Sequence, residues 1–371
     1  MERPYISDTS SWIAMLSNTS IAFLKRLLDT PGPSGFETAP ARIWRDEARA
    51  FADLRADAHG NSIATVNPDG APTIMLAGHI DEIGVIVQHI DDDGFVYISP
   101  IGGWDVQVLV GQRIRFSSSV GAGDVYGVVG KKPIHLIKPE EREKASKFSD
   151  LWVDIGATSR AEAQKRLSVG DSGVIDSRTL DFPNDRIVSR SIDDRIGAFV
   201  VLEALRRYSE RPGEARVVAV ATTQEEISWR GGGAGVCASG LGAQMAIVVD
   251  VTFATDHPGI EKKEVGDHPI GSGPVLTRGS IISPVVFNIL RSTADELKLP
   301  YTLHAAGRDT GTDADAIHVA REGIATAVLS VPNRYMHSPN ELVSLSDLDR
   351  AATLIAESCR KVGRGTDFTE R

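Results

Sequence analysis

Apolar residues recur along the N-terminal part of the chain in two patterns, first at helical spacing and then in short runs with strand character. Residues 21–28 and 37–54 have helical spacing, and the Pro- and Gly-rich segment 31–35 between them is typical of a turn. The strand-like runs cover residues 62–66, 73–77, 84–88 and 95–99. We therefore expect two helices and then a series of strands, the last two joined as a hairpin through residues 91–94.

Strand signals continue from residue 111 to 176, with one helical interruption at 159–167. The run 217–221 is short, continuous and β-branched, which suits a buried strand. Helices are expected at 194–205, near Gly235 and at 284–297, 315–322 and 345–361, and strands at 246–249, 301–304 and 325–331. This alternation predicts an α/β fold with helices on both faces of a sheet, and a small β-rich unit inserted between two α/β pieces.

The chain has 371 residues, with 40 Lys and Arg against 50 Asp and Glu, so its formal charge is −10. At roughly 150 residues per domain, this length corresponds to about two domains. The acidic balance, with no basic cluster beyond the Lys pairs at 131–132 and 262–263, argues against a nucleic-acid partner. Cys237 and Cys359 lack the spacing of a zinc site, so we expect plain buried thiols. The sequence has no membrane-spanning apolar stretch and no secretory signal, which predicts a cytoplasmic protein without a membrane partner.

Histidines and carboxylates follow or precede apolar runs in five segments. His79 and Asp81 follow the strand at 73–77, where Asp81 is placed to hold the tautomer of His79. The other segments contain Asp193 and Asp194 before a helix, Glu225 and Glu226 after the strand at 217–221, Asp250 after that at 246–249, and His337 after that at 325–331. Because strands of an open α/β sheet end at a shared crevice, we expect these side chains to converge. Two histidines with four of these carboxylates are typical of a dinuclear site for zinc or cobalt.

Each segment taken singly also has a simpler interpretation. Asp193 and Asp194 suit the start of a helix as N-caps, although one of them can cap while the other reaches a metal. Glu225 and Glu226 are adjacent on an extended chain, so we expect their side chains to point in opposite directions. The remaining segments are common as polar loops or solvated strand ends. The five segments indicate a site only because their side chains are expected to converge.

Together with further motifs, these segments give the chain a specific resemblance to the tetrahedral (TET) aminopeptidases. This is a family of glutamyl-aminopeptidase-like dinuclear metallopeptidases, some of whose members carry the names cellulase M or endoglucanase. The resemblance spans nearly all of residues 18–360 and rests on segments 78–84, 100–104, 132–136, 192–195, 224–226, 249–252, 311–314 and 334–339. It implies a mixed sheet with helices on both faces in a catalytic domain made of residues 1–81 and 176–371. It also implies an inserted β-rich, PDZ-like or barrel domain at 82–175.

The resemblance implies a role for each converging side chain. Two divalent metal ions, zinc or cobalt, would be held by a bridging Asp193, by His79 and Asp250 on one ion, and by Glu226 and His337 on the other. Asp81 would orient His79, and Glu225 would be the general base. The implied activity is removal of N-terminal residues from short peptides by metal-activated water.

Through the same resemblance, the inserted domain is expected to form dimers that assemble into a dodecameric tetrahedral shell. The alternative role of this domain is a lid that shapes the substrate site. Such a shell admits peptides and excludes folded proteins. His135 would be placed to reach the active site of a neighbouring subunit. The chain departs from the family at Ser228 and Trp229 and in the Gly-rich segment 231–235, which leaves the preferred N-terminal residue open.

Other activities fit the sequence less well. Segment 233–238 matches the GxGxxA dinucleotide pattern, but it does not follow its strand directly, as a phosphate-binding turn must. A glycosidase needs two carboxylates facing each other about 5 to 9 Å apart, which the adjacent Glu225 and Glu226 cannot provide. An inactive assembly protein would be expected to lack Glu225 or a metal ligand. A dinuclear-metal deacylase or amidohydrolase on the same scaffold is the open alternative to the expected aminopeptidase.

Overall fold

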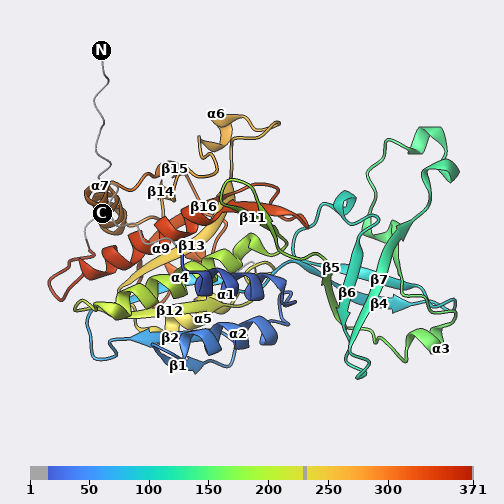
Figure 1. Cartoon of the computed structure of the whole chain (residues 1–371), viewed down its shortest axis with the longest axis horizontal. Helices are drawn as coiled ribbons and strands as arrows, with labels where there is room; N and C mark the ends of the chain where they lie inside the picture. The colour runs from blue at the N-terminus through green and yellow to red at the C-terminus, as the bar shows by residue number, and fades with distance from the viewer. Residues whose placement is uncertain (1–15, 229–231, 370–371) are drawn as a thin grey trace, which may run out of the picture.

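The computed structural model of the chain describes residues 16–228 and 232–369, and its main body is built on an eight-stranded sheet (Figure 1). The central strands, which are parallel to one another, are β12 (Arg216–Thr222), β3 (Thr73–His79), β13 (Met245–Phe253) and β16 (Ala325–Asn333). Beyond β12 lie β2 (Ser62–Val66), which is antiparallel to it, and β1 (Asp53–Ala56). Beyond β16 lie β14 (Val275–Gly279), which is antiparallel to it, and β15 (Thr302–Ala306), which pairs with β14 in parallel. The predicted mixed sheet is confirmed.

Helices cover both faces of this sheet, which is why its central strands are apolar and buried at nearly every position. On one face lie α1 (Asn18–Asp29), α2 (Thr38–Ala48), α4 (Ile192–Glu210), α7 (Pro284–Leu297) and α9 (Leu345–Arg360). The other face is covered by α5 (Gly232–Leu241) and α8 (Ala314–Ile317), which also pack on each other. Because α4 packs on the sheet and also contacts α1, α2 and α9, most of its side chains are buried.

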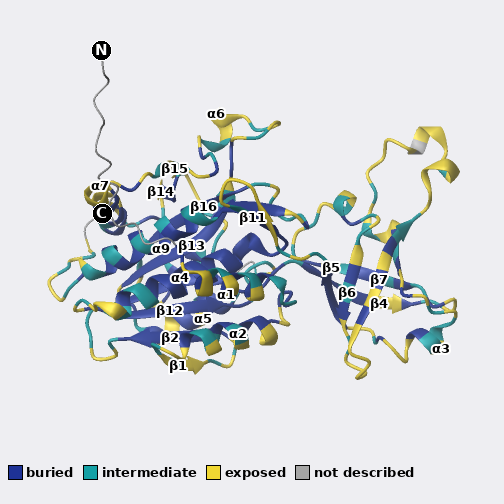
Figure 2. Cartoon of the chain, in the orientation of Figure 1, coloured by how far each residue is buried: buried dark blue, intermediate teal, exposed yellow. Residues whose placement is uncertain are grey.

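A second body stands beside the main sheet as a closed antiparallel barrel (Figure 1). Its strands in order are β4 (Gly84–Ile90), β5 (Val96–Ile101), β8 (Leu151–Asp154), β7 (Asp124–Lys131), β6 (Arg113–Ser117) and β9 (Ser172–Ile175). Between them lie α3 (Arg160–Ala163) and the single 3-10 turns η1 (Val106–Val108), η2 (Ile134–Leu136), η3 (Pro139–Glu141) and η4 (Phe148–Asp150). The barrel has its own apolar core, which includes Val87, Phe116 and Leu151 (Figure 2).

Several short elements differ from the sequence prediction. Residues 37–54, predicted as one helix, form α2 and then β1, because the chain beyond the helix pairs with β2. The helices predicted at 159–167 and 315–322 are the shorter α3 and α8. The strands β14, β10 (Leu180–Phe182), β11 (Arg186–Ser189) and β17 (Glu341–Ser344), and the helix α6 (Lys262–Val265), were not predicted. β10, β11 and β17 form a small antiparallel sheet of their own.

A buried cluster of charges holds the two connections between the main body and the barrel. Glu82, which follows β3, contacts Arg190 and Arg195, and all three side chains are at most 6% exposed. The Glu82 carboxylate also accepts a hydrogen bond from the backbone N–H of Gly32 at 3.0 Å. Glu82 lies where the chain enters the barrel, and Arg190 lies after the chain has returned to the main body. This cluster therefore fixes the point where the barrel joins the main body, which we call the root of the barrel.

Neither thiol is bonded to another cysteine. Cys237 and Cys359 are buried and free, as predicted, and burial raises the pKa of each to about 12. Among the described residues, no helix combines the length and the apolar character needed to cross a membrane.

Candidate metal centre and active site

The residues singled out in the sequence converge at the carboxyl ends of the central strands, which form one edge of the sheet. Strands β12, β3, β13 and β16 are neighbours in that order and run parallel, so their carboxyl ends meet at this edge. The side chains there are His79 at the end of β3, Asp250 on β13, Glu225 and Glu226 after β12, His337 after β16, and Asp193 and Asp194 in the first turn of α4.

Asp193 lies between the two histidines. Its Oδ1 atom is 3.2 Å from Nε2 of His79, and its Oδ2 atom is 3.3 Å from Nε2 of His337. Beside them, Oε1 of Glu226 lies 3.3 Å from Nε2 of His337, and Oε2 of Glu225 lies 3.8 Å from Nε2 of His79. Asp193 thus presents one carboxylate oxygen to each of the two imidazoles.

Within the part of the chain that the structure describes, two sets of three side chains have ligand atoms within 4.8 Å of one another, namely His79, Asp194 and Asp250, and His79, Asp193 and Glu226. Asp194 belongs to the first set but was not among the predicted ligands. Its two oxygens accept hydrogen bonds from the backbone N–H of His79 at 3.2 Å and of Gly197 at 3.0 Å. Asp194 therefore caps the start of α4, while Asp193 faces the histidines.

Asp81 connects His79 to the loop that carries the two glutamates. Its Oδ1 atom lies 3.4 Å from Nδ1 of His79. Its two oxygens accept hydrogen bonds from the backbone N–H of Glu225 and of Glu226, each at 3.2 Å, and the hydroxyl of Ser34 donates to the same carboxylate. Asp81 thus lies behind His79 and holds the glutamate loop in place.

The loop geometry corrects one expectation. Glu225 and Glu226 do not lie on an extended strand, because β12 ends at Thr222 and Gln224 has a positive φ of 61°. The two side chains still face different histidines. A turn, and not the alternation of a strand, separates them.

The site brings together several buried carboxyl groups whose ionised forms are disfavoured, so their pKa values are raised. Burial, with the charge of Asp193, raises the pKa of Asp250 well above its ordinary value and also raises that of Glu226. Burial likewise raises the pKa of Glu225 to about 10. Burial opposes protonation of His337, but Asp193 and Glu226 outweigh it and raise its pKa to about 11. Without a metal, protons bind at these groups, and bound cations would neutralise the same negative charge.

The donor atoms fit divalent metal ions. Oε1 of Glu226, a proposed ligand atom, is buried without a hydrogen-bond partner within residues 16–228 and 232–369. The Glu226 oxygen faces Nε2 of His337, and a cation between them would satisfy both atoms. Imidazole nitrogen and carboxylate oxygen are also the donors that zinc and cobalt accept in proteins.

Two further buried acids belong to the site. Asp313, 2% exposed, accepts a hydrogen bond from the hydroxyl of Thr222. Glu341 accepts hydrogen bonds from the backbone N–H of Asp193 at 3.0 Å and of His337 at 2.9 Å. The motif at 311–314 was a signal for Asp313, whereas nothing in the sequence pointed to Glu341.

The other sequence features fall on the barrel and near the glutamate loop. His135 lies on η2 and is exposed. Ser228 follows the glutamates, while Trp229 and Gly231 lie outside the described residues. The rest of the Gly-rich segment opens α5.

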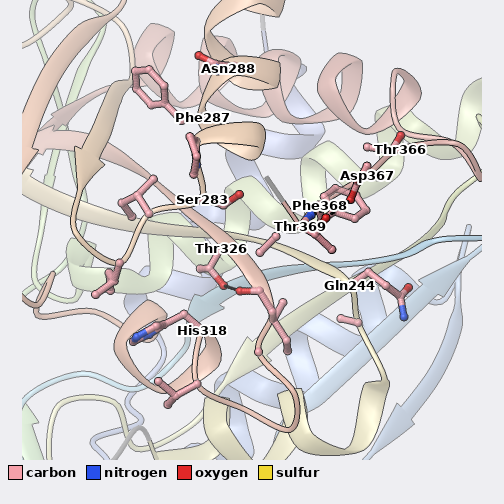
Figure 3. Close-up of a pocket in the computed structure, with 18 of the residues that line it drawn as sticks. Gln244, Ser283, Phe287, Asn288, His318, Thr326, Thr366, Asp367, Phe368 and Thr369 are labelled. Atoms are coloured by element: carbon pink, nitrogen blue, oxygen red, sulfur yellow. Dashed lines mark hydrogen bonds between the residues drawn. The ribbon is translucent and has the colours of Figure 1, made fainter. Parts of the chain in front are cut away.

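Two cavities differ in their relation to this site. One of about 520 Å³ adjoins Glu225 and is lined by Asp313 and Asp315 together with parts of α5 and α8. Another of about 1200 Å³ is lined by Gln244, Ser283 and other residues at the amino ends of β13 and β16 (Figure 3). The second cavity therefore lies at the amino ends of the strands, across the sheet from the site, and its lining includes none of the predicted site residues.

Comparison with known proteins agrees with these observations. The sequence pattern of the M42 glutamyl aminopeptidases matches residues 60–354. The chain belongs to this family. The M42 chain is 36% identical to the lysyl aminopeptidase of Pyrococcus furiosus over 351 residues, which cover 93% of this chain and 98% of that protein.

Solved structures of TET aminopeptidases share the whole fold of this M42 chain. The TET aminopeptidase from the marine sediment archaeon Thaumarchaeota archaeon SCGC AB-539-E09 has a TM-score of 0.88 at 33% identity, over 94% of this chain and 97% of that one. The TET1 peptidase of Pyrococcus horikoshii, which can assemble into a tetrahedron or a large octahedral shell, has a TM-score of 0.81 at 28% identity, over 92% and 100%. The predicted resemblance and fold class are confirmed.

Proposed function

We propose that this M42 peptidase is a metal-dependent aminopeptidase that hydrolyses the N-terminal residue from short peptides. The observation that carries the proposal is the position of Asp193, whose two oxygens face His79 and His337 within a buried cluster of acids. The likeness to aminopeptidases along almost the whole chain supports the same reaction class.

The proposed cofactor is a pair of divalent ions, zinc or cobalt. His79 and Asp250 would hold one ion, Glu226 and His337 would hold the other, and Asp193 would contribute to both. The three ligand carboxylates leave the pair of ions with a small net positive charge, which favours an oxyanion. Asp81 and Asp194 hold His79 through its ring and its backbone N–H, respectively.

Glu225 is the proposed general base. Bound divalent ions lower the pKa of water and polarise a peptide carbonyl. Glu225 takes the proton from the attacking water and returns it to the leaving amine. It suits this role because its Oε2 atom lies 3.8 Å from Nε2 of His79, beside the proposed ligands but farther from the histidines than the oxygens of Asp193 and Glu226, which lie 3.2 to 3.3 Å away.

Recognition of a free amino group separates this proposal from the deacylase or amidohydrolase alternative. The cavity beside Glu225 has Asp313 and Asp315 in its lining. Negative charge next to the base favours a substrate whose N-terminus is a free ammonium group over one whose N-terminus is blocked.

The deciding experiment compares free and N-acetylated aminoacyl anilides as substrates. Protein stripped by a chelator is assayed before and after reloading with cobalt or zinc. The proposal expects metal-restored cleavage of the free-amine substrates only, and the panel also ranks the preferred N-terminal residue. Cleavage of the acetylated substrates would favour the deacylase, and no cleavage at all would contradict both activities.

We further propose that residues 1–81 and 176–371 are the catalytic domain and that residues 82–175 are a dimerisation domain. Dimers would assemble into a tetrahedral dodecamer, with a substrate-shaping lid as the alternative role of the barrel. The exposed apolar residues Tyr126, Val128 and Leu136, 52%, 49% and 65% exposed, support a contact surface on the barrel. The assembly of the P. horikoshii relative supports a homo-oligomer.

Light scattering on the purified protein tests this assembly, since a dodecamer, a dimer and a monomer differ severalfold in mass. His135 lies on the exposed η2 turn and is proposed to reach a neighbouring active site. Loss of activity in His135→Ala with unchanged mass would support that contact. The cytoplasmic location stays a prediction from the sequence.

A further inference from the structure

The two histidines of the proposed metal centre are held in different ways. The His79 side chain is 2% exposed, ends a central strand and is backed by Asp81 of the main body. The His337 side chain is 32% exposed and lies in a loop where Tyr335 and His337 both have a positive φ, 63° and 56°. This backbone region is disfavoured for residues with a side chain, so contacts from outside the loop must hold His337.

Two hydrogen bonds fix His337. Its backbone N–H donates to Oε1 of Glu341 at 2.9 Å, and its ring Nδ1 lies 2.8 Å from the backbone carbonyl oxygen of Gly103. A carbonyl oxygen can only accept, so Nδ1 carries the ring proton and Nε2 is left free as a ligand atom. Nε2 is the atom that faces Asp193 and Glu226.

Gly103 comes from the barrel and not from the main body. It follows β5 in residues 102–104, which we call the barrel loop. The indole Nε1 of Trp104 donates to the carbonyl oxygen of Gly84 on β4 at 2.8 Å. Gly102 has a φ of 76°, and a Cβ atom there would lie 2.6 Å from Cγ2 of Ile83. Contacts at the root of the barrel therefore determine where the Gly103 carbonyl lies.

We infer that the Gly103 carbonyl is a positioning group for His337, so that binding of the second metal ion depends on how the barrel loop is seated. The inference rests on the proposed two-metal function. Histidines that bind metals almost always donate their other ring N–H, and loss of such a partner typically weakens metal binding roughly 10- to 100-fold. The groups that hold His79, namely Asp81 and Asp194, belong to the main body, so the first ion does not share this dependence.

Two barrel-loop variants and one matched control test the inference. Trp104→Phe keeps an aromatic ring and removes the hydrogen bond to Gly84. Gly102→Ala adds a methyl group where the loop has no room for it at a positive φ. Trp152→Phe makes the same aromatic substitution elsewhere on the barrel, where the ring packs edge-on against Phe95. Each intact protein is stripped of metal and titrated with Co²⁺, with calorimetry and visible absorption to count the bound ions.

The wild type and Trp152→Phe are expected to bind two ions per chain. Trp104→Phe and Gly102→Ala are expected to bind one ion as tightly as the wild type and the other roughly tenfold or more weakly, with activity restored at excess Co²⁺. A general loss of fold would weaken both ions together, and circular dichroism checks for it.

Two ions bound with wild-type affinity by both loop variants would overturn the inference and leave the proposed function intact. Equal weakening of both ions in both variants would also overturn it, because the effect would not be confined to His337. A wild-type protein that binds fewer than two ions would instead contradict the two-metal function, and the inference would fall with it.

Discussion

Replacing Glu225 by Gln tests whether the two adjacent glutamates have different tasks. The amide keeps the size of the carboxyl group but cannot accept a proton from water. Because Glu225 lies farther from the histidines than Asp193 and Glu226 and is not one of the proposed ligands, the variant should keep its metal. Loss of a general base slows a reaction about 10²- to 10⁴-fold. At about 1.36 kcal/mol per factor of ten, this corresponds to an activation barrier higher by about 2.7 to 5.4 kcal/mol.

Glu226→Gln is the matched control, because Oε1 of Glu226 lies 3.3 Å from Nε2 of His337 and Glu226 is a proposed ligand. For both variants, kcat is measured on a free-amine aminoacyl anilide, and metal content is measured by mass spectrometry. Glu225→Gln is expected to keep the wild-type metal content with a greatly lowered kcat, whereas Glu226→Gln should lose metal. Metal loss in Glu225→Gln, or turnover close to wild type, would refute the assignment of the base.

The remaining predictions concern metal binding and stability. His337→Ala should bind one ion in place of two, and an unchanged stoichiometry would remove His337 from the ligand set. Glu82→Gln should lower the free energy of unfolding by about 3 to 5 kcal/mol in urea titrations, because Arg190 and Arg195 would keep buried charges without their partner; a negligible change would contradict the role of this cluster. Saturating metal at about 100 times its Kd should stabilise the protein by about 2.7 kcal/mol per site, and identical unfolding midpoints with and without chelator would argue against a metal bound to the native state.

The catalytic edge of the sheet was predictable from the sequence for a physical reason. Short apolar runs such as 217–221 and 246–249 suit buried strands better than helices, and parallel strands in an α/β sheet deliver the residues at their carboxyl ends to one place. His79 and Asp250 therefore converge through the fold itself. The barrel was also foreseeable as a β-rich insertion.

The contacts that hold the ligands were not predictable from the sequence. Glu341 is an ordinary acid near His337 until β17 and β11 pair and bring it beneath Asp193. The Gly103 carbonyl has no side-chain signature at all, and it meets His337 across a separation of 234 residues. Short strands such as β10 carry too little periodicity to be recognised, because tertiary pairing alone makes them strands.

The two chain crossings between the barrel and the main body also have a mechanical consequence. A body attached through one flexible linker can swivel in every direction, but the barrel is joined to the main body by two chain crossings, near Glu82 and near Ile175, which line the same small cavity. Such an attachment behaves as a lever whose pivot lies at the root. Trp104 and His337 line the same small cavity as Glu82 and Arg190, so they sit near that pivot. Flexing of the barrel would therefore sweep its distal end through the largest arc and displace the Gly103 carbonyl least.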